Sequence, residues 1–149
     1  MKKLVDQILK FGVVGVICFG IDFVITLAIS AMLRNAGMKT AGAALIGAFF
    51  GFTISVIINY LLSMKFVFVR REDMDRRREF IIFVVLSLIG LGINEAIIKV
   101  SIDVVYVHAA LLAQYLTPGM ATAAAKIIAT AVVMVYNFIT RKLFLEQKN

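Results

Sequence analysis

Four long apolar stretches constrain the fold of this chain more than any other feature. They cover residues 11–33, 41–64, 80–102 and 120–139. A helix needs about 20 apolar residues to cross the hydrocarbon core of a bilayer. Backbone N–H and C=O groups in lipid must be hydrogen-bonded within the protein, and for isolated stretches of this length only helices achieve that. The sequence therefore predicts an all-α membrane protein with four transmembrane helices in one domain, residues 1–149.

Composition and charge also favour a membrane location. Hydrophobic residues make up 62% of the chain, whereas soluble domains contain roughly 45–50%. The net charge of +7 is compatible with binding nucleic acid or anionic lipid, but the basic loop at 70–79 has no aromatic residues for base stacking. We therefore expect membrane lipids, and not nucleic acid, as partners. Cys18 is the only cysteine, so we expect no disulfide, metal or other cofactor.

Lysine and arginine residues are distributed unequally between the two predicted sides of the membrane. Twelve lie at the two ends of the chain or in the loop between the second and third stretches, whereas the opposite side carries two, Arg34 and Lys39. Loops rich in Lys and Arg remain in the cytoplasm. We therefore predict that both termini are cytoplasmic and that the loops at 30–41 and 103–119 are outside.

The two halves of the sequence resemble each other. Residues 11–22 align without gaps on residues 83–94, and both segments begin with Phe and end in Gly-Ile-Asp or Gly-Ile-Asn. Residues 59–66 and 137–144 both begin with Asn and an aromatic residue and end in Phe. Chance matching between apolar segments is the alternative, but paired polar positions match less easily by chance.

We therefore predict two tandem two-helix repeats, residues 8–69 and 77–145. Because each repeat contains two spans, both repeats have the same orientation in the membrane. They should be related by a pseudo-two-fold axis along the membrane normal, an arrangement known in transporters.

Ionisable and amide side chains occur within or beside the apolar stretches. A charged residue at the centre of a membrane helix costs about 2.5–3.5 kcal/mol on insertion scales, and such residues usually face a bundle interior or a site. Intervals of about four residues give each helix one polar or small face, and the four faces can converge. We predict that one polar, substrate-binding cavity is lined by Asp22, Asn59, Asn94, Glu95, Lys99, Lys126, Asn137 and Arg141.

Structural roles remain open for several of these positions. The small residues in the second stretch, which include Gly47 and Gly51, favour close packing of helices. Asn59 and Asn137 also fit hydrogen bonds between helices.

Charge pairing is a further alternative for part of the set. Glu95 and Lys99, four residues apart, also fit a pair that neutralises itself on one helix. Asp22 and Lys126 have no opposite charge nearby in the sequence, which favours a functional role for them. Basic groups toward both ends of the membrane, with amides between, suit an anionic headgroup such as phosphate.

Several motifs resemble the GtrA-like family. They are Phe11-Gly-Val-Val-Gly with Asp22, Asn59-Tyr…Lys65-Phe66, Gly92-Ile-Asn94, Lys126, and Asn137-Phe…Arg141. The resemblance covers roughly residues 8–145, with Ser63 and Met64 where the family often carries a basic residue. It implies a multi-pass protein of the bacterial plasma (inner) membrane that acts in cell-surface polysaccharide synthesis. Its members are thought to move polyprenyl-phosphate-linked sugars or to assist a membrane glycosyltransferase.

Three functions remain open at this stage. They are translocation of a polyprenyl-phosphate-linked sugar, a non-transporting role beside a glycosyltransferase, and small multidrug-type cation transport. Lys99 and Lys126 disfavour the third because they repel cations. Catalysis is disfavoured because the sequence has no nucleophile-base-acid set or phosphate loop. Four short helices form a thin wall around a prenyl headgroup, which is compatible with a homodimer.

Overall fold

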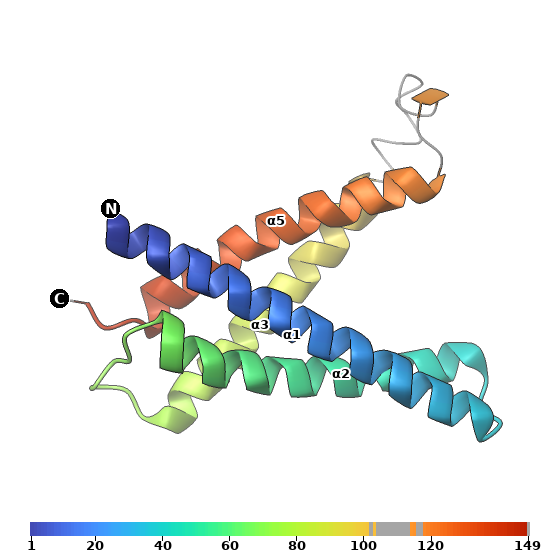
Figure 1. Ribbon diagram of the computed structural model, residues 1–149, viewed down its shortest axis with the longest axis horizontal. Coiled ribbons are helices and arrows are strands. Elements are labelled where there is room, and N and C mark those ends of the chain that lie inside the picture. Colours follow the sequence, from blue (N-terminus) through green and yellow to red (C-terminus); the bar gives the residue numbers. More distant parts are fainter. Residues whose placement is uncertain (102, 104–113, 116–117, 149) are drawn as a thin grey trace. The chain divides into compact units, whose positions relative to one another are not determined.

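Helices account for most of the described structure, a computed structural model that describes residues 1–101, 103, 114–115 and 118–148. The helices are α1 (Lys2–Asn35), α2 (Thr40–Leu62), α3 (Arg76–Val100) and α5 (Pro118–Leu145), and the π-helical turn η1 (Ser63–Val67) follows α2 (Figure 1). Each predicted apolar stretch coincides with one of these helices, so the all-α, four-helix prediction is confirmed for the described residues. Most of the predicted outer loop 103–119 lies outside them.

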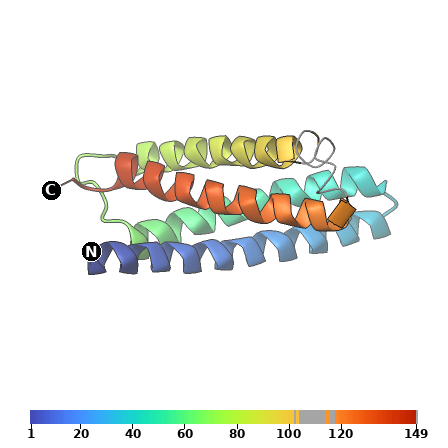
Figure 2. The same ribbon diagram turned by 90° about the horizontal axis from the view of Figure 1, so that it is seen from above.

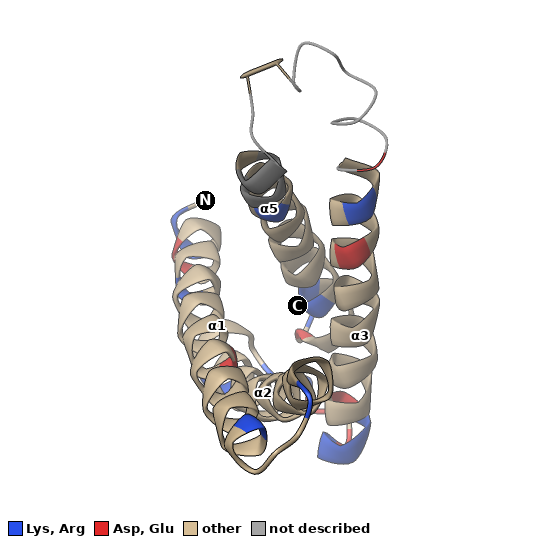
Figure 3. Ribbon diagram, turned by 90° about the vertical axis from the view of Figure 1, so that its right-hand side faces the viewer, with Lys and Arg blue, Asp and Glu red and all other residues tan. Residues whose placement is uncertain are grey.

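Large apolar side chains cover the outside of these helices. Phe19 is 70% exposed, Leu45 73% and Ile127 71%. Figure 3 shows that Lys, Arg, Asp and Glu occupy only small parts of the helices, so most of the helix length carries no charge. Within the described residues, four helices are long and apolar enough to cross a membrane. Because exposed apolar surface on this scale suits contact with lipid, the chain is a multi-pass membrane protein.

A tight turn joins α1 to α2. Gly37 has a φ of 96°, a conformation that glycine adopts without a side-chain penalty. The Met38 N–H donates to the Leu33 carbonyl and the Gly37 N–H donates to the Arg34 carbonyl, both at 3.0 Å. These two bonds form a Schellman motif, which satisfies carbonyl groups at the end of α1 and ends the helix. The two helices then lie side by side (Figure 2).

Glycines in α2 allow that helix to approach α1 closely. A Cβ atom added at Gly51 would lie 2.7 Å from the Asp22 carbonyl oxygen, and one added at Gly47 would lie 2.6 Å from the Thr26 carbonyl oxygen. Side chains of any size at these positions would push the helices apart. The close packing predicted for the small residues of the second stretch is therefore confirmed.

The second helix pair consists of α3 and α5. The Tyr136 hydroxyl donates to the Leu86 carbonyl at 3.4 Å. A Cβ atom added at Gly90 would lie 2.9 Å from Asn137 Oδ1 and 3.5 Å from Val133 Cγ1. A glycine thus also marks the close approach in this pair, although here it meets side chains and not the backbone of the neighbouring helix.

The chain divides into two compact units. Unit 1 contains Met1–Asp75 together with Glu146–Asn149, and unit 2 contains Arg76–Leu145. Unit 1 therefore holds the α1–α2 pair and the C-terminal residues, and unit 2 holds the α3–α5 pair.

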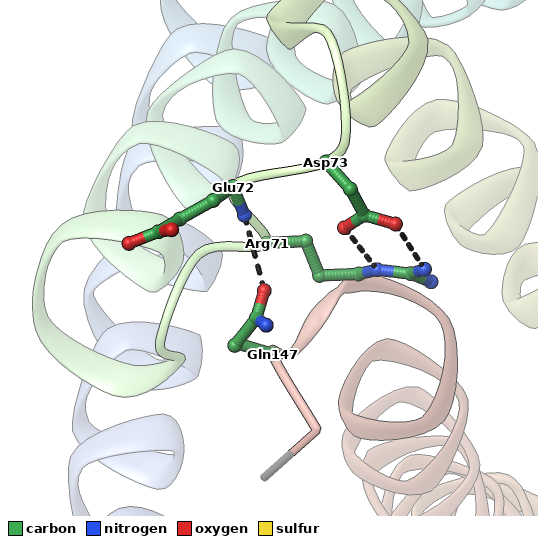
Figure 4. Close-up of polar contacts among 4 residues, drawn as sticks. All are labelled: Arg71, Glu72, Asp73 and Gln147. Carbon is green, nitrogen blue, oxygen red and sulfur yellow. Dashed lines mark hydrogen bonds and ion pairs between the residues drawn. The ribbon is translucent and has the colours of Figure 1, made fainter.

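Backbone and side-chain hydrogen bonds fix the C-terminal residues within unit 1. The Gln147 N–H donates to the Val69 carbonyl at 2.8 Å, and Gln147 Oε1 accepts from the Glu72 N–H at 3.1 Å (Figure 4). Beside them, Arg71 donates two hydrogen bonds to the Asp73 carboxylate at 3.1 and 2.8 Å. The hydrogen bonding and charge of Asp73 raise the pKa of the Arg71 guanidinium.

Gly51→Ala should lower the free energy of unfolding by about 1–3 kcal/mol, the usual cost of overpacking. The added methyl group would collide with Thr26 and Asp22 across the helix contact. Gly20→Ala is the matched control, because nothing lies within 4 Å of a Cβ atom at that position. Reversible unfolding in detergent micelles measures both variants. Equal stability of the two would contradict the close-contact account.

Candidate functional site

Asp22 lies at one of the close approaches of α1 and α2. Its Oδ1 accepts a hydrogen bond from the Thr26 hydroxyl at 3.1 Å. The carboxylate borders Gly51, which presents no side chain to cover it. Asp22 is half-buried. The fold therefore places a carboxylate against the neighbouring helix at mid-span, where the sequence predicted a functional residue.

Hydroxyl groups extend this polar contact on either side of Asp22. The Ser55 hydroxyl donates to the Cys18 carbonyl at 3.0 Å, and the Ser30 hydroxyl donates to the Ala43 carbonyl at 3.2 Å. Both bonds join α1 to α2. Side-chain hydrogen bonds of this kind hold membrane helices together where water is absent.

Asn59 lies near the end of α2 and is half-buried. Its Oδ1 accepts a hydrogen bond from the Ser63 hydroxyl at 2.9 Å. Ser63 is 0% exposed and begins η1, where the Phe68 N–H donates to the Ser63 carbonyl at 2.9 Å. Such π-helical turns are frequent at functional sites. This hydrogen bond of Asn59 is thus local to α2 and η1.

Arg141 is buried, with 2% exposure, and α3 supplies its contacts within unit 2. Its Nη2 donates to the Ser87 hydroxyl at 3.0 Å. The guanidinium carbon lies 3.9 Å from the centre of the Phe83 ring, and a cation over an aromatic face is favourable, more so when desolvated. The Ser87 hydroxyl donates in turn to the Phe83 carbonyl at 2.8 Å. One turn of α3 therefore binds the cation by both stacking and hydrogen bonding.

Two amides of unit 2 have different surroundings. Asn137 lies against Gly90, and its buried Oδ1 has no hydrogen-bond partner among the described residues. Buried acceptors without a partner are uncommon in proteins. Asn94 is half-buried and donates to Glu95 Oε1 at 3.4 Å.

The remaining predicted site residues, Glu95, Lys99 and Lys126, are exposed. In the described part of the chain, Glu95 and Lys99 form no ion pair with each other. The Glu95 carboxylate accepts from Asn94 instead. The self-neutralising pair on α3 is therefore not formed in this structure, and the alternative remains a prediction.

The register of the α3–α5 pair determines toward which end of the pair each basic residue lies. Arg141 contacts Ser87 near the start of α3, and Gly90 faces Asn137 near the middle. Because the two helices are antiparallel, this register puts Lys99 and Lys126 at a similar level, toward the other end of the pair from Arg141. Unit 2 thus carries basic groups toward both ends and amides between them.

Sequence reasoning missed the burial of Glu79. It is the last residue of the basic loop predicted at 70–79, but it lies in the first turn of α3 and is 1% exposed. Glu79, Phe83 and Ser87 are four residues apart and share one helix face. That spacing, which continues the face that binds Arg141, is the signal that could have revealed it.

Residues 10–145 match the family described as GtrA/DPMS, transmembrane domain. The match spans all four helices, so the chain belongs to this family, and the resemblance carried by the short motifs is confirmed. Comparison with curated proteins and with solved structures gives no match. The family places the protein among membrane proteins of glycan or polysaccharide synthesis.

Ser87→Ala should destabilise the α3–α5 pair by about 1.5–3 kcal/mol, the usual worth of a hydrogen bond to a charged group. Thr53→Ala is the matched control. The exposed Thr53 hydroxyl also donates to the carbonyl four residues earlier, but it accepts from no guanidinium. Chemical unfolding in detergent should show a loss below about 0.5 kcal/mol for the control. Similar losses in both variants would contradict the role assigned to Ser87.

Proposed function

We propose that this protein translocates polyprenyl-phosphate-linked sugars across the bacterial plasma membrane for cell-surface glycan synthesis. The proposal is carried by the retention of ionisable side chains within the spans of a GtrA/DPMS transmembrane domain. Asp22 lies against Gly51 at mid-span, and Lys126 lies within the fourth apolar stretch. Groups of this kind are costly in lipid and generally mark a substrate pathway.

The charges favour an anionic substrate. Lys99 and Lys126 lie toward one end of the α3–α5 pair and Arg141 toward the other, so the pair carries basic groups near both ends. Lysine binds phosphate as a point charge and arginine as a planar bidentate donor. Asn137 retains a hydrogen-bond acceptor without a partner among the described residues, which a sugar hydroxyl can satisfy. A cation would be repelled by both lysines.

The proposed substrate-contacting set retains every residue predicted from the sequence. Asp22 and Asn59 supply the acidic and amide groups of unit 1, and the other members belong to unit 2. We assign the full set to contact with the phosphate and sugar during translocation: Asp22, Asn59, Asn94, Glu95, Lys99, Lys126, Asn137 and Arg141.

Lys126→Ala should reduce translocation of a fluorescent polyprenyl-phosphate sugar in proteoliposomes by more than about tenfold, because an ammonium group next to phosphate contributes at least about 1.4 kcal/mol. Lys39→Ala removes a positive charge outside the spans and is the matched control. Asp22→Asn should also slow translocation, because the amide removes the negative charge that α1 carries at mid-span. Folded Lys126→Ala protein with wild-type translocation would contradict the proposal.

The same assay separates transport from assistance to a glycosyltransferase. Reconstituted wild-type protein, with no enzyme present, should make the fluorescent lipid accessible to a quencher on the far side of the membrane. A wild-type rate equal to that of empty liposomes would favour the non-transporting partner and exclude a flippase.

We also propose that both termini are cytoplasmic. The basic residues that support this orientation include Arg76, Arg77 and Arg78 in the first turn of α3. A helix N-terminus disfavours positive charge, so contact with anionic headgroups gives these arginines a better explanation than helix stability does.

Cysteine labelling in intact cells should report this orientation. Cysteine at Asn35 should react with an impermeant thiol reagent, whereas cysteine at Asp73 should react only after the cells are permeabilised. A second outer position, His108, lies outside the described residues. The native Cys18 is 2% exposed and should contribute little background. Labelling at Asp73 in intact cells would reverse the orientation.

We further propose that the α1–α2 and α3–α5 pairs are tandem repeats. In the alignment of the halves, Cys18 corresponds to Gly90 and Ser55 to Val133. Ser55 bonds to Cys18 in unit 1, and Val133 lies 3.5 Å from a Cβ position at Gly90 in unit 2. The same aligned positions therefore meet in both pairs, which supports duplication.

Burial follows the same alignment. Phe11 is 5% exposed and its counterpart Phe83 is 0% exposed, while Val67 and Leu145 are 7% and 0% exposed. Gly51 is buried, and its counterpart Ala129 is 0% exposed.

Spin labels at aligned, exposed positions should lie at equal membrane depth. Phe19 corresponds to Leu91, and these side chains are 70% and 41% exposed. Ile57 corresponds to Val135, with exposures of 41% and 58%. Oxygen-accessibility measurements in bilayers report the depths. If the two labels of either pair differed in membrane depth by more than one helical turn, about 5.4 Å, the repeat would be contradicted.

A further inference from the structure

An apolar groove opens on the surface of unit 1, between α1 and the end of α2. Its volume is about 380 Å³, within the lower part of the range of about 300–1,000 Å³ that ligand cavities occupy. Leu9, Val13 and Ile17 line it from α1, and Leu62 and Phe66 line it from α2 and η1. It therefore offers hydrocarbon contacts and almost no hydrogen bonds.

One lysine lines this groove and a second is the chain neighbour of a lining residue. Lys10 is the only charged residue that lines it. Lys65 Nζ lies 5.2 Å from the centre of the Phe66 ring, which forms part of the wall. Lys10 pairs with Asp6 at 2.8 Å, but the two side chains are 54% and 62% exposed. Exposed pairs of this kind contribute little stability, so Lys10 can exchange Asp6 for another anion.

The groove runs from the charged end of α1 into its apolar stretch. Lys10 precedes Phe11, the first residue of that stretch. Ile17 lies about 10 Å further along the axis at about 1.5 Å per residue. A ligand that fits this arrangement has an anionic head at the membrane boundary and a hydrocarbon chain that points into the bilayer.

We propose that this groove holds the phosphate-proximal isoprene units of polyprenyl phosphate, with the phosphate at Lys10 and Lys65. This inference rests on the proposed function, because it assigns a place to the lipid part of the proposed substrate. Polyprenyl phosphate carries one chain for each phosphate, whereas an anionic phospholipid carries two chains for each phosphate. The groove is small and lies between only two helices, which favours a lipid with one hydrocarbon chain over a lipid with two.

Photocrosslinking of the full-length protein in phosphatidylcholine nanodiscs tests the groove. The probe is polyprenyl phosphate with a diazirine in its first isoprene units, and peptide mass spectrometry locates the attachment. Crosslinks should fall on the segments that contain Val13 and Leu62. Val13→Trp should reduce them about tenfold, the equivalent of about two buried CH₂ groups. Val16→Trp should retain them.

The two valines make a matched pair. Val13 is 59% exposed and Val16 is 69% exposed, so tryptophan at either position leaves the helix contact intact, but only Val13 lines the groove. Combined Lys10→Gln and Lys65→Gln substitutions should weaken crosslinking, and Lys3→Gln should not. Equal crosslinking in the two tryptophan variants would overturn the proposal. Competition by phosphatidylglycerol as effective as that by unlabelled polyprenyl phosphate would overturn it as well.

The result is distinguishable from that of the proposed function. If the protein forms crosslinks in the groove but does not translocate lipid-linked sugar, the groove proposal is supported and the flippase function is contradicted. If the wild-type protein translocates the lipid-linked sugar but gives no crosslinks at Val13 or Leu62, the flippase function is supported and the groove proposal is contradicted.

Discussion

The close approach of α2 to α1 at Gly47 and Gly51 is the contact on which unit 1 depends. Lipid tails are as apolar as leucine, so membrane helices associate through short-range packing and hydrogen bonds. The two glycines bring backbone and side-chain oxygens of α1 within contact distance. At that distance the Ser30 and Ser55 hydroxyls reach carbonyl groups of the opposite helix. Asp22 is consequently placed against a helix backbone.

The second pair solves a similar problem with different chemistry. In the proposed alignment, Ser63 corresponds to Arg141, and Gly15 corresponds to Ser87. The Ser87 hydroxyl accepts from Arg141, but Gly15 offers no acceptor, so an arginine in place of Ser63 would lack this hydrogen bond. In unit 1 the ring that corresponds to Phe83 is that of Phe11, which lies tilted against the Phe68 ring with 5.9 Å between the ring centres.

Sequence periodicity predicts some parts of this structure and not others. Apolar stretches of about 20 residues specify helices because lipid leaves the backbone no other partner, and four-residue intervals identified the Gly47–Gly51 contact. Periodicity specifies a helix face but not the atom that a side chain meets. For that reason the sequence does not predict the hydrogen bond between Glu95 and its neighbour Asn94.

The central claim is that the polar side chains of the spans face water or substrate and not lipid, and thiol accessibility tests it most directly. In a Cys18→Ala background, cysteine at Asp22 or Lys126 should react with a small charged methanethiosulfonate reagent in native membranes. Polyprenyl-phosphate sugar should slow both reactions. Cysteine at Phe19 or Ile127, which are 70% and 71% exposed on the apolar surface, should not react. Equally low reactivity at all four positions would contradict the claim.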